Sequence, residues 1–292
     1  MSENQLIVNA DDLGMSVGIN NGIRRSYDNG ILTSTSLMMV GEAVDDAITC
    51  LNQRPGLGRG IHVALTDGEP ITDSDAVETL VTDDGTFYSD GFTFYTNWFR
   101  GRIDPTHVRK EVNAQIALAM SRLDSVDHLN SHMHIHMIPK IYDIFDKYAK
   151  EYDIPYVRYS HERLPLTTRA ITSGYLFRTI ANPGIIKKFV LSILGAFTRR
   201  RSSIATDSFA GVVHVGNMTE SVLTSLLESS AFPSTELCVH PGEYEENRQT
   251  SRKDLNAARE NDLKGLTSER VISLAETNFD LITIREFAER NE

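Results

Sequence analysis

The sequence contains few of the residues from which several common kinds of site are built. Only Cys50 and Cys238 are cysteines, and neither belongs to a Cys-x-x-Cys pair, so a zinc ribbon and a redox dithiol are not expected. Basic residues are outnumbered, 29 against 40 acidic, which gives a formal net charge of -11. Because nucleic-acid surfaces neutralise phosphates with clustered basic side chains, we expect no nucleic-acid partner.

Long apolar runs are also missing. No stretch reaches the roughly 18 consecutive apolar residues that a membrane-spanning helix needs. The start of the chain lacks the basic region and apolar run of a signal peptide. We therefore expect a cytoplasmic protein without a transmembrane segment.

Short apolar or β-branched segments alternate with helical patterns along the whole chain. This alternation predicts an α/β fold with mostly parallel strands, in an open sheet or a barrel. Because (β/α) barrels of about 250 residues are single domains, we expect one domain over 1–292, with an excursion at 66–102 and a helical insertion at 165–205. Strands are predicted at 6–9, 34–40, 59–63, 125–129, 156–159, 209–215, 236–239 and 281–284, and helices at 17–28, 42–52, 105–122, 140–152 and 220–229.

Side chains that can bind a metal or move a proton follow four of the predicted strands. Asp11 and Asp12 come after the first strand, His62 ends the third, and His132 and His240 follow two later ones. Taken singly, each has a structural explanation, such as a turn or a helix cap for the aspartates. Because function in parallel α/β folds gathers at the carboxyl ends of strands, we expect these side chains to converge on one site.

Histidine is concentrated in one segment, where four of the nine fall between residues 128 and 136. Imidazole is a common metal ligand near neutral pH. The four cannot all bind one ion beside Asp12 and His62, so some are predicted to orient a ligand or contact substrate. One aspartate and two histidines with open positions are typical of a catalytic metal centre, which indicates a metal-assisted hydrolase or isomerase. The four are His128, His132, His134 and His136.

The last of these strands ends in Cys238, Val239 and His240. Strand alternation places Cys238 and His240 on one face, which makes the thiol a conceivable nucleophile. Cys238 lies between two apolar residues, and we interpret it as core. His240 precedes Pro241 in a turn at the strand's exposed end and is the candidate general acid.

Several of these motifs occur in an order that resembles the YdjC family of carbohydrate deacetylases, whose best-known members are chitooligosaccharide deacetylases. The resemblance covers most of the chain, from residue 6 to about 243. Its motifs are Val-Asn-Ala-Asp-Asp-Leu-Gly at 8–14, Gly-Ile-Leu-Thr-Ser-Thr at 30–35, Gly-Ile-His at 60–62, His-Leu-Asn-Ser-His-Met-His-Ile-His at 128–136 and Val-His-Pro at 239–241.

The resemblance implies a distorted (β/α) barrel of the TIM-like type, a divalent cation usually described as Mg²⁺, and a homodimer. It implies that Asp12, His62 and His132 bind the metal, that Asp11 is the base which deprotonates water, and that His240 protonates the departing amine. The implied substrate is an N-acetylated amino sugar or short oligosaccharide, from which the acetyl group is removed.

Asn130 departs from the family pattern, which commonly has aspartate at this position. Asparagine keeps the ability to orient a ligand but not the charge. An Asp-His-His ligand set also suits Zn²⁺, Mn²⁺ or Co²⁺. Two functional alternatives stay open: another metal-dependent barrel enzyme acting on sugars, such as an isomerase or phosphoesterase, and a non-catalytic carbohydrate-binding relative.

Two further segments each allow two interpretations. Residues 185–201 are apolar, with Lys187 and Lys188 near one end and three arginines at the other. They predict either a helix packed on the barrel or in a dimer contact, or an interfacial helix that touches an anionic membrane or a lipid-linked glycan. The aromatic residues of the 66–102 excursion predict either a lid that stacks on sugar rings or a small core of its own.

Overall fold

The computed structural model describes residues 4–198, 204–245 and 253–291. Within these ranges, one sheet of parallel strands runs in the order β5-β4-β3-β2-β1-β7-β6, and β8 pairs with the start of β1. The strands are β1 (Gln5–Leu13), β2 (Ser34–Leu37), β3 (Gly58–Val63), β4 (His128–Ser131), β5 (Tyr156–Val157), β6 (Ser208–Ala210), β7 (Ser234–Val239) and β8 (Asp280–Leu281).

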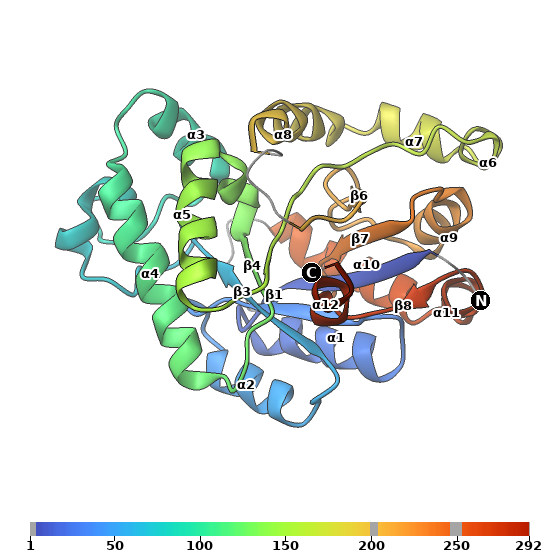
Figure 1. The fold of residues 1–292 in the computed structure, drawn as a ribbon, viewed down its shortest axis with the longest axis horizontal. Helices are drawn as coiled ribbons and strands as arrows, with labels where there is room; N and C mark the ends of the chain where they lie inside the picture. The colour runs from blue at the N-terminus through green and yellow to red at the C-terminus, as the bar shows by residue number, and fades with distance from the viewer. Residues whose placement is uncertain (1–3, 199–203, 246–252, 292) are drawn as a thin grey trace.

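The sheet curls so that its outer strands, β5 and β6, approach each other (Figure 1). One parallel bridge joins Glu162, in the segment after β5, to Phe209 of β6. The predicted fold class, an α/β barrel of distorted TIM-like form, is confirmed. Because all strands of the sheet are parallel, their carboxyl ends share one rim, and β1 lies on it between β2 and β7.

Helices surround the sheet, and three of them, α6 to α8, lie together along the upper edge of Figure 1. The 66–102 segment contains a 3-10 turn, η1 (Ser74–Leu80), and helix α3. A second 3-10 turn, η2 (His132–Met137), follows β4. The helices are α1 (Val17–Asp28), α2 (Val44–Asn52), α3 (Gly91–Phe99), α4 (Pro105–Arg122), α5 (Pro139–Glu151), α6 (Thr168–Thr172), α7 (Tyr175–Ala181), α8 (Ile185–Thr198), α9 (Glu220–Ser229), α10 (Lys253–Leu266), α11 (Glu269–Asn278) and α12 (Ile284–Asn291).

The predicted helices at 17–28, 105–122 and 220–229 begin and end where the sequence places them. Several strand boundaries were predicted wrongly: the strands predicted at 34–40, 156–159, 209–215 and 281–284 end earlier, at residues 37, 157, 210 and 281. β1 continues past residue 9 to Leu13, with a shift of its register against β2 between Ala10 and Leu13. β4 begins three residues later and ends two residues later than predicted, and its four residues are buried in the sheet.

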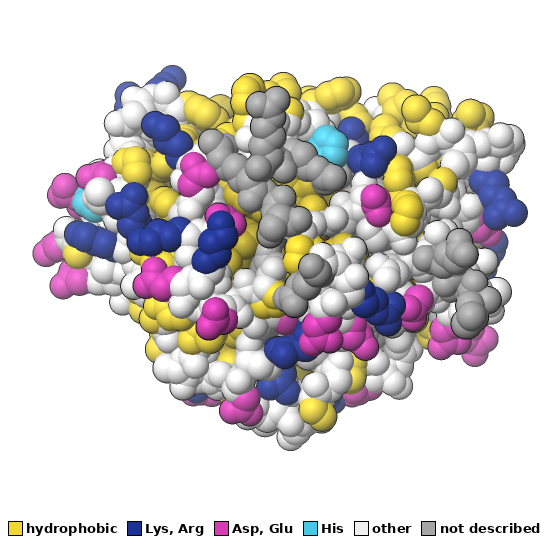
Figure 2. All heavy atoms as spheres, viewed as in Figure 1, with side chains coloured by type: hydrophobic (Ala, Val, Ile, Leu, Met, Phe, Trp, Pro, Cys, Tyr) yellow, Lys and Arg dark blue, Asp and Glu magenta, His cyan; other side chains and the backbone are white. Residues whose placement is uncertain are grey.

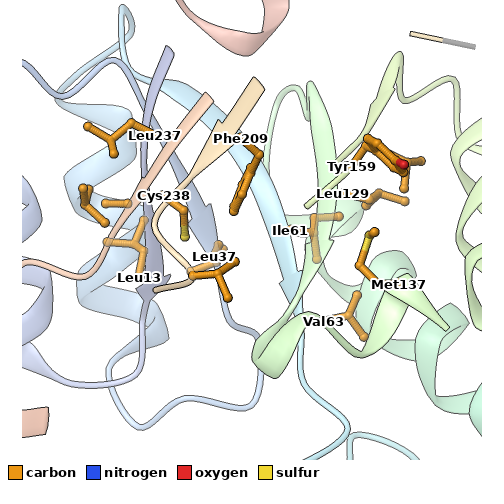
Figure 3. Close-up of a cluster of buried hydrophobic side chains, with 14 of the residues drawn as sticks. Leu13, Leu37, Ile61, Val63, Leu129, Met137, Tyr159, Phe209, Leu237 and Cys238 are labelled. Carbon is orange, nitrogen blue, oxygen red and sulfur yellow. The ribbon is translucent and has the colours of Figure 1, made fainter. Parts of the chain in front are cut away.

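The interior of the curled sheet is filled by apolar side chains from most of the strands. Figure 3 shows the ring of Phe209 between a group from β1, β2 and β7 and a group from β3, β4 and the segments after β4 and β5. Phe209 is buried, as are the side chains around it. Close packing of this kind fixes the strand ends against one another, so that side chains placed on the rim keep a defined geometry. The labelled neighbours are Leu13, Leu37, Ile61, Val63, Leu129, Met137, Tyr159, Leu237 and Cys238.

Candidate metal centre

Asp12, His62 and His132 meet at the rim, and all three are buried. Asp12 Oδ1 lies 3.2 Å from His62 Nε2 and 3.1 Å from His132 Nδ1, and these two nitrogens are 3.4 Å apart. Donors that share one ion at about 2.1 Å are roughly 3.0–3.4 Å apart in octahedral or tetrahedral geometry. The triangle therefore has the size that a single divalent ion requires, and the predicted convergence of these three residues is confirmed.

The tautomer of His62 supports the same conclusion. Its Nδ1 is 2.6 Å from Oδ1 of Asn130, whose amide nitrogen donates to Asp11 and Ser36. Nδ1 of His62 must therefore carry the proton, which leaves the Nε2 lone pair facing the carboxylate of Asp12. Two lone pairs at this distance repel each other unless a cation lies between them, so the donor set fits a metal ion.

Left-handed backbone conformations orient the ligands of the metal triangle. Asp12 has a φ of 70°, and Met133 and His134, directly after His132, have φ values of 56° and 57°. Non-glycine residues in this left-handed region cost about 1–2 kcal/mol each, and such strain gathers at functional sites. Here it directs His132 toward Asp12 and turns the following residues away from the triangle.

Asn130 connects the metal triangle to Asp11. Its amide nitrogen donates to Oδ1 of Asp11 at 3.2 Å while its oxygen accepts from His62. An aspartate at this position would place a second carboxylate against Asp11. In this chain the amide of Asn130 makes the contact with Asp11 attractive. Asn130 also makes the hydrogen bonds that it needs to orient His62, the role predicted for it.

Asp11 is buried beside the triangle in an ion pair that the sequence did not predict. Both of its oxygens accept from Arg158, at 2.7 and 2.8 Å. Burial alone would raise the pKa of Asp11, but Arg158 and His62 hold that pKa well below its usual range. Asp11 therefore stays a carboxylate at neutral pH.

Arg158 is the largest fully buried side chain of the described residues. Its Nε donates to Glu236 at 2.6 Å, and Glu236 also accepts from Tyr156. A buried guanidinium between two carboxylates keeps its charge and its planar geometry. The sequence held one signal for Arg158, because it lies in the segment predicted as a strand at 156–159. In the structure it directly follows β5, at the same rim as Asp11 and His62.

A second buried arginine pairs with the metal triangle. Arg259 of α10 donates to Oδ2 of Asp12 at 2.5 Å. Asp67, in the loop after β3, lies 3.4 Å from His132 Nε2, on the side of the ring that faces away from Asp12. No pattern in the sequence pointed to Arg259 or Asp67, because neither follows a strand end directly.

A cavity of about 30 Å³ opens onto these groups, which is room for about two species the size of water. Both predicted proton-transfer residues line it. The lining residues are Asp11, Asp12, His62, Ser131, His132, Met133, His134, Lys187, Val215 and His240.

His240 belongs to a second group of possible ligand atoms, together with Asp11 and Cys238, all within 4.8 Å of one another. Burial lowers the pKa of His240 to about 4, although Asp12 and Asp11 act to raise it, so the ring is neutral at pH 7. Its backbone N–H donates to Asp262 at 2.9 Å, which fixes the turn after β7. Cys238 is buried, as expected for a core residue, and its thiol donates to Asp11 at 3.2 Å.

The other clustered histidines lie outside the metal triangle. His128 pairs with Asp127 at 2.6 Å, below the rim. His136 contacts the Ser131 hydroxyl at 2.7 Å, and burial lowers its pKa to about 3. His134 faces the cavity, and its Nδ1 contacts Ser160 at 2.9 Å. Of these three, only His134 lies where a substrate can touch it.

The charge around His132 predicts how metal binding depends on pH. Burial would lower the pKa of His132, but Asp12 and Asp67 raise it to about 9. At pH 7 the metal-free ring is protonated, and an ion must displace that proton to bind. Affinity is expected to rise about tenfold per pH unit from 7 to 9 and then level off. Mn²⁺ titration calorimetry in buffers of different ionisation enthalpy measures both the affinity and the released proton, and a pH-independent affinity would contradict the assignment of His132.

A family model described as YdjC-like protein matches residues 5–277. The carbohydrate deacetylase of Thermoanaerobacter pseudethanolicus is 33% identical over 202 residues, 68% of this chain and 78% of that protein. The carbohydrate deacetylase of Brevibacillus brevis is 30% identical over 270 residues, covering 87% of this chain and 92% of that one. A chitooligosaccharide deacetylase of Salmonella paratyphi B is 36% identical over 154 residues, 51% of this chain and 57% of that protein.

A solved structure from Enterococcus faecalis V583, described as a candidate cellobiose-phosphate cleavage protein, has a TM-score of 0.74. It covers 97% of this chain and 98% of its own at 20% identity, so the likeness concerns the fold alone. The family match spans nearly the whole described chain and includes every residue of the metal triangle. The chain therefore belongs to the YdjC-like family, and the three relatives named above are carbohydrate deacetylases.

Proposed function

We propose that this protein is a metal-dependent deacetylase that removes the N-acetyl group from an amino sugar or a short oligosaccharide. The observation that carries the proposal is the triangle of Asp12, His62 and His132, with a buried carboxylate and a neutral histidine at the same cavity. Kinship with carbohydrate deacetylases supports the reaction and the substrate class.

A divalent ion held by Asp12, His62 and His132 supplies Lewis-acid activation of water and of the amide carbonyl. Two imidazoles and one carboxylate suit Zn²⁺, Mn²⁺ or Co²⁺ on ligand softness, while the family resemblance favours Mg²⁺. We expect a homodimer on the same resemblance.

Asp11 is proposed to accept the proton of the attacking water. Arg158 keeps this carboxylate ionised and aligned, so it is available as a base throughout the neutral range. A C–O bond forms at the acetyl carbon, and the C–N bond then breaks. The sugar nitrogen leaves as an amine after it takes up a proton.

His240 is proposed to deliver that proton. Because its ring is neutral above about pH 4, it must first receive the proton during the same turnover. Ligand atoms of Asp11 and His240 lie within 4.8 Å of each other, which gives the water proton a short path from the base to the departing nitrogen.

Acetate release tests the proposal. The purified protein is incubated with N-acetylglucosamine and its oligomers, first after chelation and then with Mg²⁺, Zn²⁺, Mn²⁺ or Co²⁺ added back. We expect acetate only in the presence of metal, at one acetate per free amine formed. Sugar phosphates and free aldoses serve as parallel substrates. Phosphate release, or isomerisation without acetate, would contradict the proposal and favour the alternative enzymes.

A further inference from the structure

Helices α6, α7 and α8, together with the segment that leads into them, form a layer over the rim of the barrel beside η2, α5 and α9 (Figure 1). We call this layer the cap, residues 163–198. No single helix of the described residues is long and apolar enough to cross a membrane; α7 and α8 pass that criterion only as a pair, bent by 90° at the break between them.

The outer side of the cap is apolar. Nine of the 14 strongly exposed large hydrophobic side chains in the described residues lie between residues 166 and 197. Figure 2 shows hydrophobic side chains gathered along the upper edge, over these helices. A soluble protein rarely exposes so much contiguous apolar surface unless a partner covers it.

Helix α8 has two apolar faces. Leu191 and Leu194 are buried and pack toward the barrel. A second set recurs at the spacing of a helical face and is 45–70% exposed. A helix that is apolar on both sides needs a second apolar environment beyond the core. The exposed set is Ile186, Phe189, Val190, Ile193 and Phe197.

The charge of this region identifies the kind of partner. Residues 163–206 contain eight of the 29 basic residues of the chain and none of its 40 acidic residues. Three of the eight, Arg163, Arg169 and Arg178, lie on or just before α6 and α7, and Lys187 and Lys188 lie on α8. A second copy of the chain would bring like charges together across a two-fold contact. Anionic lipid headgroups above an apolar layer match both properties of the cap.

An apolar groove connects the cap to the metal centre. It lies between α3 and α8 and has a volume of about 1410 Å³. The groove shares Met133, Lys187 and Val215 with the cavity at the metal triangle. That cavity holds only about two species of water size, so a larger substrate must extend from it along the groove.

We propose that the cap docks on an anionic lipid bilayer and that the groove receives the lipid part of a lipid-linked N-acetylated sugar. The bilayer surface would supply the substrate at the mouth of the groove, with the sugar toward the metal triangle. The substrate half of this proposal depends on the deacetylase function proposed above, whereas the docking half does not.

Vesicle flotation tests the docking half. The full chain is mixed with two kinds of phosphatidylcholine vesicle. One kind contains no phosphatidylglycerol, and the other contains about 30 mol% phosphatidylglycerol, which is chosen to reproduce an anionic surface. We expect flotation with the anionic vesicles, weakened by salt. Phe189→Ser combined with Ile193→Ser, two exposed residues that do not line the groove, should weaken partition at least about tenfold. Ile71→Ser, an exposed apolar residue outside the cap, is the matched control and should change nothing.

Charge reversal gives an independent comparison. Lys188→Glu should reduce flotation at low salt, and Lys147→Glu, the same change on an exposed lysine of α5, should not. Absence of flotation with anionic vesicles would overturn the docking half. A lipid-free dimer that the Phe189→Ser and Ile193→Ser changes dissociate, without vesicle binding, would overturn it in favour of a second copy.

Acetate release tests the substrate half. Wild-type protein should release acetate at least about tenfold faster from an N-acetylglucosaminyl lipid in anionic vesicles than from a soluble oligomer at equal sugar concentration, because docking raises the local concentration of substrate. The Phe189→Ser and Ile193→Ser variant should lose this advantage and keep the soluble rate. Equal rates on both substrates would overturn the substrate half. No acetate from either substrate would instead refute the deacetylase function. Vesicle flotation would still test the docking half, because that measurement does not depend on activity.

Discussion

Replacing Asp11 with asparagine is expected to slow acetate release by about 10²–10⁴-fold, the range that removal of a general base produces. Asparagine has nearly the same shape and can still accept hydrogen bonds from Arg158 and Ser36. The metal triangle does not include Asp11, so the ion should still bind with nearly the affinity of the wild type. Calorimetric Mn²⁺ titration beside the acetate assay measures both properties.

The control for this variant is Glu236→Gln. Arg158 pairs with two buried carboxylates, and either substitution removes one of them. Breaking a buried ion pair costs up to about 3–5 kcal/mol of unfolding free energy, so both variants should melt at lower temperature. Glu236 does not line the cavity, and its variant should keep most of its turnover at a permissive temperature. Equal losses of turnover in both variants would show that Asp11 affects turnover only by pairing with Arg158 and stabilising the fold, and not as a general base.

Those parts of the fold that depend on local chemistry could be predicted from the sequence. Helix α4 begins at Pro105 after the capping Asp104, and α1 ends at Asp28 before Asn29 and Gly30, all of which are local signals. The end of β4 was predicted at Leu129 rather than Ser131, because Asn130 and Ser131 have the polarity of a loop. In the structure Asn130 and Ser131 are buried strand residues whose polar atoms contact His62 and His136.

The metal triangle could be predicted because each of its residues lies at or just after a strand's carboxyl end, and the topology of parallel strands brings such ends together. Arg158 was missed although it also follows a strand. From the sequence alone, a charged residue at the end of a strand is interpreted as facing solvent. The partner of Arg158, Asp11, is also 147 residues away in the sequence. Only the packed structure shows that two carboxylates compensate the buried guanidinium.

The polar network changes the roles assigned to individual residues. In the sequence, Asp11 and Asp12 are equivalent neighbours, each able to bind a metal or to accept a proton. In the structure, Arg158 and Asn130 surround Asp11, while His62 and His132 surround Asp12. Two adjacent carboxylates thus receive different environments, one set up for proton transfer and one for ligation.

Replacing Asp12 with asparagine is expected to abolish metal binding. The amide is a far weaker ligand for a divalent ion, and the lost charge also removes the attraction that draws a cation to the two histidines. Loss of an outer partner of a ligand costs about 10–100-fold in metal affinity, and loss of the ligand itself should cost about 10³-fold or more. Acetate release should fall at least in proportion.

Asp67→Asn is the matched control for Asp12→Asn. Both aspartates have a left-handed backbone, with φ values of 70° and 61°, and asparagine tolerates that conformation. Asp67 lies 3.4 Å from the far nitrogen of His132 and outside the triangle, so its variant should lose only about 10–100-fold in affinity.

Thermal melting separates these two variants without an activity assay. An ion at about 1,000 times its dissociation constant stabilises the fold by about 4.1 kcal/mol, so wild-type protein should melt well above its chelated form. Asp67→Asn should keep most of this shift at saturating metal. Asp12→Asn should show none, and a metal-dependent shift of wild-type size in that variant would place the ion elsewhere, with Asp12 serving only to neutralise Arg259.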